Sequence, residues 1–306
     1  MTDSSLHATG RSGAPRQQAI TLTMADGTMG ALDMGDPARP FDLVFLHANG
    51  FNARTYLGLL EPLSHNWRVL ALDLRGHGST RLPTRTAGRR NWADMQADVR
   101  LALQQVEAER IVLAGHSMGG SLSILTGAGA PDQVAQIVAI DPVVWPRLIT
   151  VALNLPGVSR LAARTPLVSG ALRRRNGFSS PRSALQGWRG RGAFTGWPDA
   201  VLQDYVADAL ERGEDGRWHL TCPPVWEASN YAAQAQNVWR AASRASQPIR
   251  VLRAERGSTC FFPEGDSHGG RMSVTRVPGT THFMPMLSPE PVRSALIAAL
   301  QSRESV

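Results

Sequence analysis

A glycine-flanked serine stands between an apolar run and a small-residue stretch near the middle of the chain. Residues 111–114 read Ile-Val-Leu-Ala, which is long enough for a buried strand, and residues 115–119 follow at once as Gly-His-Ser-Met-Gly. The stretch from Ser121 to Leu125 is small and apolar and can continue as a helix. A chain that passes from strand to helix so abruptly must turn tightly at Ser117, and the flanking glycines remove the Cβ atoms that would collide there.

This turn gives the hydroxyl of Ser117 an unusual position. We expect it to stand above the sheet edge, over a helix N-terminus that supplies backbone N–H groups and the positive end of a dipole. Strand, turn, serine and helix in this order form the context of a nucleophile elbow, so we predict that Ser117 is a catalytic nucleophile. The plainer interpretation is a glycine-rich turn whose serine only caps the helix.

The rest of the chain alternates apolar runs with amphipathic stretches. Apolar runs predict a hairpin and further strands, at residues 19–24, 29–34, 43–46, 67–72, 134–140, 248–252 and 273–277. Helical spacing predicts helices at residues 52–63, 92–107 and 289–301. This alternation indicates βαβ units, so the predicted fold class is α/β, with a mostly parallel central sheet flanked by helices. Right-handed crossovers would bring the strand ends that carry His47, Ser117 and Asp141 to one edge.

The pattern changes between residues 143 and 246. Prolines, glycines, arginines and six of the eight tryptophans gather there, clear strands stop, and helical pieces are visible at residues 200–212 and 229–242. We interpret residues 143–246 as a helical cap inserted between two segments of one core, residues 19–142 and 247–306. Residues 1–18 are polar and lack the apolar stretch of a signal peptide, so we expect a flexible leader and a cytoplasmic protein.

Composition excludes several classes of protein. A hydrophobic content of 42% with 19% charged residues is that of a globular chain, and no apolar run approaches the ~20 residues of a membrane helix. Two cysteines, Cys222 and Cys260, favour a reduced compartment. The net charge of +7 comes from 32 basic residues that are all arginine and are spread along the chain, without any nucleic-acid motif. We therefore expect neither nucleic acid nor a membrane as a partner, and we leave the oligomeric state open.

Four motifs in a fixed order resemble those of the α/β-hydrolase fold, in particular its esterase-like branch with a helical cap. The first two are an oxyanion loop at residues 47–51 (His-Ala-Asn-Gly-Phe) and a glycine-rich turn at residues 73–79 (Asp-Leu-Arg-Gly-His-Gly-Ser). The other two are the nucleophile elbow at residues 115–119 and a late Pro-Gly-x-x-His motif at residues 278–282 (Pro-Gly-Thr-Thr-His). Each motif alone is weak, but their order and spacing together are specific. The resemblance extends over residues 19–301.

The resemblance implies a role for each matching residue. Ser117 corresponds to the nucleophile and His282 to the general base, and the N–H groups of Asn49 and Met118 correspond to the donors of the oxyanion hole. His47 and His77 would order loops. The resemblance implies no cofactor and no metal.

The third member of the triad departs from the family pattern. The family usually places an aspartate in the turn that is Ala-Glu-Arg-Gly-Ser here, at residues 254–258. Three carboxylates could replace it. Asp141 follows the preceding strand, where haloalkane dehalogenases place their acid, whereas Glu255 lies in the usual turn but is displaced. Asp266 lies further along. We favour Asp141 slightly over Glu255, and both over Asp266.

These residues predict a serine hydrolase that cleaves carboxylic esters of a small, apolar molecule through an acyl-enzyme. A serine in the elbow argues against dehalogenase or epoxide hydrolase chemistry. The same triad would serve lactones or carbon–carbon bond hydrolysis, and a non-catalytic ligand-binding homologue is the alternative of another class. Several aromatic residues hint at apolar pocket walls, namely Trp188, Trp197, Trp226, Phe261 and Phe262.

Overall fold

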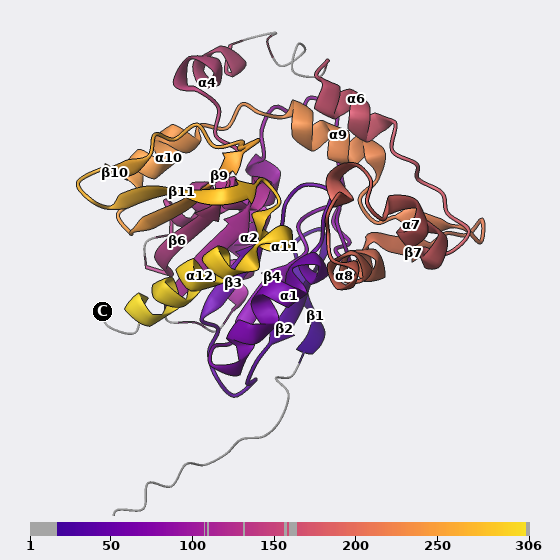
Figure 1. Ribbon diagram of the computed structural model, residues 1–306, viewed down its shortest axis with the longest axis horizontal. Coiled ribbons are helices and arrows are strands. Elements are labelled where there is room, and N and C mark those ends of the chain that lie inside the picture. Colours follow the sequence, from indigo (N-terminus) through magenta and orange to yellow (C-terminus); the bar gives the residue numbers. More distant parts are fainter. Residues whose placement is uncertain are drawn as a thin grey trace, which may run out of the picture.

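A nine-stranded sheet forms the centre of the molecule (Figure 1). The computed structural model describes residues 17–303 apart from 107, 109, 131, 156–157 and 159–163. The strand order is β1-β2-β4-β3-β5-β6-β9-β11-β10. The bounds of these strands are β1 (Gln17–Met24), β2 (Gly27–Met34), β3 (Leu43–Leu46), β4 (Val69–Leu72), β5 (Ile111–His116), β6 (Val134–Ile140), β9 (Ile249–Arg256), β10 (Gly265–Ser267) and β11 (Met272–Thr281).

The six strands from β4 to β11 are parallel, whereas β1, β2 and β10 pair antiparallel at the two ends. Every residue of β3, β4 and β5 is buried, because helices cover both faces, and this explains why these strands read as unbroken apolar runs. Successive side chains point to opposite faces, so Phe45 and Ala71 belong to one core cluster while Val44 and Leu70 belong to the other. The predicted fold class is therefore confirmed.

The flanking helices follow the predicted positions. The chain after β3 forms a run of short helical turns, and the longer helices cover the sheet (Figure 1). Their bounds are η1 (Ala53–Tyr56), α1 (Leu57–Leu60), η2 (Glu61–His65), α2 (Ala93–Gln105), α3 (Met118–Gly127), α11 (Met284–Leu287) and α12 (Pro289–Arg303). None of the described helices combines the length and the apolar character needed to cross a membrane. Strand β1 begins at Gln17, two residues before the predicted start, and residues 1–16 of the predicted leader lie outside the described residues.

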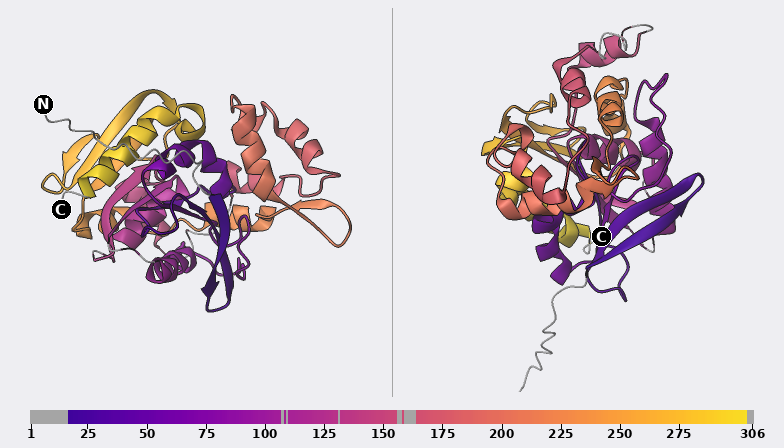
Figure 2. Two further views of the ribbon diagram at one scale, coloured as in Figure 1. Left: turned by 90° about the horizontal axis from the view of Figure 1, so that it is seen from below. Right: turned by 90° about the vertical axis from the view of Figure 1, so that its right-hand side faces the viewer.

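The segment between β6 and β9 forms six described α-helices, one described 3-10 helix and a small hairpin, and several of these elements project from one end of the sheet (Figure 2). Their bounds are α4 (Arg147–Leu153), α6 (Pro166–Leu172), α7 (Pro181–Trp188), η3 (Gly192–Phe194), α8 (Asp199–Ala209), β7 (Leu210–Arg212), β8 (Trp218–Leu220), α9 (Pro224–Ala232) and α10 (Val238–Arg244). We refer to residues 143–246 as the cap.

Two predicted elements of the cap were wrong. The predicted helix at residues 200–212 ends at Ala209, because the chain continues as β7, which pairs with β8 across a glycine-containing turn. The predicted helix at 229–242 is two helices, since the backbone N–H of Ala235 donates to Arg90 O outside the helix. The side chain of Asn237 then accepts from the N–H of Arg240 and starts α10.

The turn between β5 and α3 has the strained geometry that its sequence predicts. Ser117 has φ 55° and ψ −117°, a region that residues with a Cβ rarely adopt. The first turn of α3 lies against neighbouring strand ends, since a Cβ built on Gly119 would stand 2.1 Å from Leu46 O. A Cβ on Gly115 would stand 2.4 Å from the carbonyl carbon of Gly119. Both positions therefore require glycine.

We predict that Gly119→Ala lowers the free energy of unfolding by about 3 kcal/mol, because the backbone atoms of Leu46 and His47 leave the methyl group no space. Gly58→Ala is the matched control. Gly58 lies in α1 with open space around its Cβ position, so the same substitution raises stability by up to about 1 kcal/mol. Denaturant unfolding of both variants measures the difference, and equal stabilities would contradict the close approach.

Candidate active site

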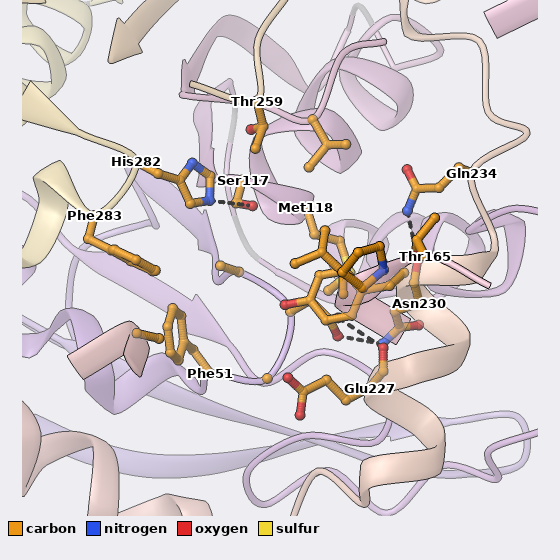
Figure 3. Close-up of a pocket in the computed structure, with 18 of the residues that line it drawn as sticks. Phe51, Ser117, Met118, Thr165, Glu227, Asn230, Gln234, Thr259, His282 and Phe283 are labelled. Atoms are coloured by element: carbon orange, nitrogen blue, oxygen red, sulfur yellow. Dashed lines mark hydrogen bonds between the residues drawn. The ribbon is translucent and has the colours of Figure 1, made fainter. Parts of the chain in front are cut away.

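Ser117, His282 and Asp141 form one hydrogen-bonded chain at the carboxyl edge of the sheet. Figure 3 shows the contact between His282 and Ser117. His282 Nε2 lies 3.0 Å from Ser117 Oγ, and His282 Nδ1 lies 2.6 Å from Asp141 Oδ2. Because an ionised carboxylate only accepts, Nδ1–H donates to Asp141 and Nε2 is left to accept from the serine hydroxyl. The three residues follow β5, β11 and β6, so parallel strands bring them to the same edge.

The carboxylate of Asp141 is fully buried and accepts from four donors. Besides His282, they are the N–H of Ala254 at 2.8 Å, the hydroxyl of Ser258 at 2.5 Å and the N–H of Thr259 at 3.1 Å. Burial alone would raise the pKa of Asp141, but the hydrogen bonds outweigh it and hold that pKa below its ordinary value. The carboxylate is therefore ionised at neutral pH.

The other two acid candidates lie away from the imidazole. Glu255 is exposed and accepts from the N–H of Gly279, and Asp266 is exposed on β10 opposite Ser273. Among the described residues, Asp141 is the carboxylate that contacts His282. The turn at residues 254–258, where the family usually has its acid, instead supplies donors to Asp141.

The segment that follows Asp141 is held by backbone hydrogen bonds to neighbouring loops. The N–H of Val143 donates to Ser117 O at 3.3 Å, and the N–H of Val144 donates to Thr259 O at 3.0 Å. In the other direction, the N–H of Phe261 donates to Val144 O at 3.1 Å. The first residues of the cap thus belong structurally to the site.

Asn49 and Met118, whose N–H groups the sequence suggests as oxyanion donors, line the same cavity as Ser117. Met118 opens α3, so its N–H precedes the first intrahelical hydrogen bond. The N–H of Asn49 has no acceptor among the described residues. The side chain of Asn49 is held by the cap, because Asn230 Nδ2 donates to its oxygen at 2.7 Å and its amide donates to Glu227 O at 3.0 Å. Sequence reasoning missed this contribution of α9, since nothing in the motif indicates which helix covers the loop.

A second buried chain of hydrogen bonds links the oxyanion loop to the base. The backbone N–H of Ala48 donates to the Tyr56 hydroxyl at 3.0 Å, which lies 2.8 Å from His116 Nδ1. His116 Nε2 lies 2.8 Å from His282 O, which can only accept, so Nε2 carries the proton and Nδ1 accepts from Tyr56. Burial and the neighbouring His282 lower the pKa of His116 to about 3, so it is neutral.

His47 and His77 order the loops around the site, as the sequence predicts. His47 Nε2 accepts from the N–H of Leu74 at 2.9 Å, and His77 Nε2 accepts from the N–H of Gly50 at 3.1 Å. Burial lowers the pKa of His47 to about 4 and that of His77 well below its ordinary value. Both rings are therefore neutral acceptors. No cluster of residues that could hold a metal ion occurs in the described part of the chain.

Ser117 opens into a cavity of about 1080 Å³ between the sheet edge and the cap. Most of its walls are apolar, and Trp188 and Phe261 are among them. The other aromatic residues suggested by the sequence do not line it: Trp197, Trp226 and Phe262 are buried elsewhere. Trp226 shows why, since its indole N–H donates to Arg75 O in the core. The sequence does not distinguish these aromatic residues, but in the structure some line the pocket and others are buried away from it.

Comparison with known proteins agrees with this geometry. The family described as "Alpha/beta hydrolase family" matches residues 43–295. The chain belongs to the α/β-hydrolase family.

Curated relatives match shorter stretches. A putative non-heme haloperoxidase of Mycobacterium phage D29 is 36% identical over 124 residues, which are 40% of this chain and 42% of the relative. A 2-(acetamidomethylene)succinate hydrolase of Mesorhizobium japonicum is 30% identical over 99 residues, 32% of this chain and 34% of that protein. The chain thus spans less than half the length of these curated relatives.

Solved structures resemble this chain along nearly its whole length. The crystal structure of E-2-(acetamidomethylene)succinate hydrolase superposes with a TM-score of 0.71 at 20% identity, covering 94% of this chain and 100% of that one. An esterase from Mycobacterium tuberculosis gives a TM-score of 0.64 at 20% identity, covering 95% and 93%. At this level of identity the likeness concerns the fold.

We predict that Tyr56→Phe lowers the free energy of unfolding by about 2 kcal/mol, because it leaves the Ala48 N–H and His116 Nδ1 buried without partners. The ring itself fits, so cavity formation does not contribute. Guanidinium unfolding measures the loss. A variant as stable as the parent would contradict the proposed hydrogen-bond chain.

Proposed function

We propose that this α/β hydrolase cleaves carboxylic esters through an acyl-enzyme on Ser117. The single observation that carries the proposal is the chain from Ser117 Oγ through His282 to the ionised Asp141, with distances of 3.0 and 2.6 Å, at the floor of a mostly apolar cavity. These are the contacts that general-base activation of a serine requires.

The steps follow from which atom holds each proton. His282 Nε2 takes the hydroxyl proton as Ser117 Oγ attacks the ester carbonyl, and the imidazolium then protonates the leaving alcohol. Asp141 keeps the proton on Nδ1 and stabilises the charged ring. The N–H groups of Asn49 and Met118 stabilise the oxyanion, at about 3 kcal/mol for each donor. Water activated by His282 then releases the acid.

The walls of the cavity support an apolar acyl or alcohol group. The 2-(acetamidomethylene)succinate hydrolase and the esterase described above carry names that also support hydrolysis of an acyl compound. Lactones and vinylogous diketones would use the same serine. The non-catalytic alternative depended on the missing acid at residues 254–258, and Asp141 supplies a carboxylate to that turn.

We expect Ser117→Ala to abolish hydrolysis of p-nitrophenyl esters, with kcat lowered by about 10⁶-fold. The parent protein should also react with a fluorophosphonate at this residue, because Ser117 is the serine that contacts a histidine ring nitrogen in the described part of the chain. A panel of acyl chain lengths then defines the substrate. Unchanged turnover by Ser117→Ala, or an unlabelled Ser117, would refute the acyl-enzyme.

Asp141→Asn and Glu255→Gln form a matched pair. We expect Asp141→Asn to lower kcat by about 10⁴-fold, because the amide no longer fixes the tautomer of His282, and Glu255→Gln to change it less than about twofold, because Glu255 contacts only a surface turn. Circular dichroism checks that both variants are folded. Equal rates for the two variants would refute the assignment of the acid.

A further inference from the structure

The net positive charge of the protein comes from one part of the cap. Residues 142–198 contain nine arginines and not a single aspartate or glutamate, and the rest of the chain has 23 arginines against 25 acidic residues. The whole positive excess of the molecule therefore lies in this stretch, which includes α4, α6 and α7. An asymmetry of this kind indicates an anionic partner for that face.

Most of these arginines are free to meet such a partner. Arg174 pairs with Glu227, and Arg189 pairs with Asp199 at 2.9 Å. The others whose positions the structure describes pair with no described carboxylate: Arg147, Arg164, Arg173, Arg175, Arg182 and Arg191. Arg147 stacks on Trp239 and Arg175 on Phe178, so both keep their charge near apolar surface.

The same part of the cap also exposes large apolar side chains. Leu148 is 84% exposed and Val151 62% on α4, and Leu167 is 59% exposed and Leu172 54% on α6. Val225 at the start of α9, which packs against α6, is 56% exposed. Helix α4 lies at the end of the molecule opposite the β1–β2 hairpin (Figures 1 and 2). Apolar groups gathered in this way mark a contact surface.

This surface surrounds the mouth of the cavity. Ile149 on α4, Leu167 on α6 and Phe261 all line the cavity and are 42%, 59% and 51% exposed, so they form its rim. Two of the cationic residues, Arg175 and Arg191, are exposed and line it as well. The one carboxylate in the lining, Glu227, is buried and paired. The rim therefore combines apolar and cationic side chains.

The exposed apolar and cationic residues of α4, of α6 and of the cavity rim form one face of the cap, which we call the docking face. We propose that the docking face binds an anionic lipid surface, from which lipid acyl chains enter the cavity. Apolar side chains would insert between headgroups while arginines meet lipid phosphates. Any partner on this face covers the mouth of the cavity. A second protein would block it, whereas a lipid layer itself contains esters and would supply them.

The proposal departs from the expectation that no membrane would be a partner. That expectation rested on the absence of a spanning segment and on the spread of arginines along the sequence. Neither observation reports which apolar residues remain exposed on the folded cap. The identity of the ester as a lipid rests on the proposed function, whereas binding of the lipid surface does not require turnover.

Vesicle binding by the full-length Ser117→Ala protein tests the docking face without hydrolysis. We expect co-sedimentation with vesicles of equal parts phosphatidylglycerol and phosphatidylcholine, and at least about tenfold weaker binding to pure phosphatidylcholine. Raising the salt from about 0.1 M to about 1 M should weaken the binding, because the Debye length falls from about 10 Å to about 3 Å.

Variants then locate the surface. In the Ser117→Ala background, Leu148→Ser with Val151→Ser, and separately Arg164→Gln with Arg173→Gln, should each reduce vesicle binding at least about fivefold. Leu101→Ser on α2, a residue that is 40% exposed, and Arg250→Gln on β9 are the matched controls and should bind as the parent does. With Ser117 restored, all of these variants should hydrolyse a short water-soluble ester at the parent rate.

Three outcomes would overturn the proposal. They are no binding to anionic vesicles at low salt, equal binding by the docking-face variants and their controls, and a dimer in sedimentation that Leu148→Ser with Val151→Ser dissociates, since a second copy would then cover the face. Failure of the esterase assay with intact vesicle binding would refute the proposed function but leave the docking face standing.

Discussion

The close approach between the first turn of α3 and the ends of its neighbouring strands is the contact on which the site depends. Leu46 O and His47 O lie where a Cβ of Gly119 would be, and that same crowding holds Ser117 in a left-handed conformation. Ser117 lines the cavity, and its hydroxyl lies 3.0 Å from His282 Nε2. The strain at this residue is maintained by the fully buried strands on either side.

Local patterns predicted the core well because its elements are determined locally. Strands β3, β5 and β6 are apolar runs that must be buried, and the motif spacing placed Ser117 and His282 at the same sheet edge. The cap was less predictable. Its helices are short, and where they break depends on contacts with the core, such as the hydrogen bond from Ala235 to Arg90 that ends α9.

The acid illustrates what a sequence leaves open even when the motifs are clear. Asp141 directly follows β6 and Glu255 lies at the end of β9, and neither motif spacing nor charge distinguishes them. What distinguishes them is the number of donors each carboxylate meets after folding. Asp141 collects four, including the hydroxyl of Ser258, whereas Glu255 meets one N–H at the surface. Asp141 also has a positive φ of 40°, a strained conformation that a sequence pattern does not reveal.

The fastening of Val143 and Val144 has a consequence for how the cap can move. Asp141 lies directly before the cap in the chain. A movement of the cap about its first residue would therefore displace the Asp141 carboxylate and change the orientation of the His282 ring. Hydrogen bonds from these two valines to Ser117 and Thr259, and from Phe261 back to Val144, anchor the chain beyond the acid. The pivot is thereby displaced to Trp145 and the residues after it. A movement of the cap about that pivot would leave the contacts between Ser117, His282 and Asp141 undisturbed.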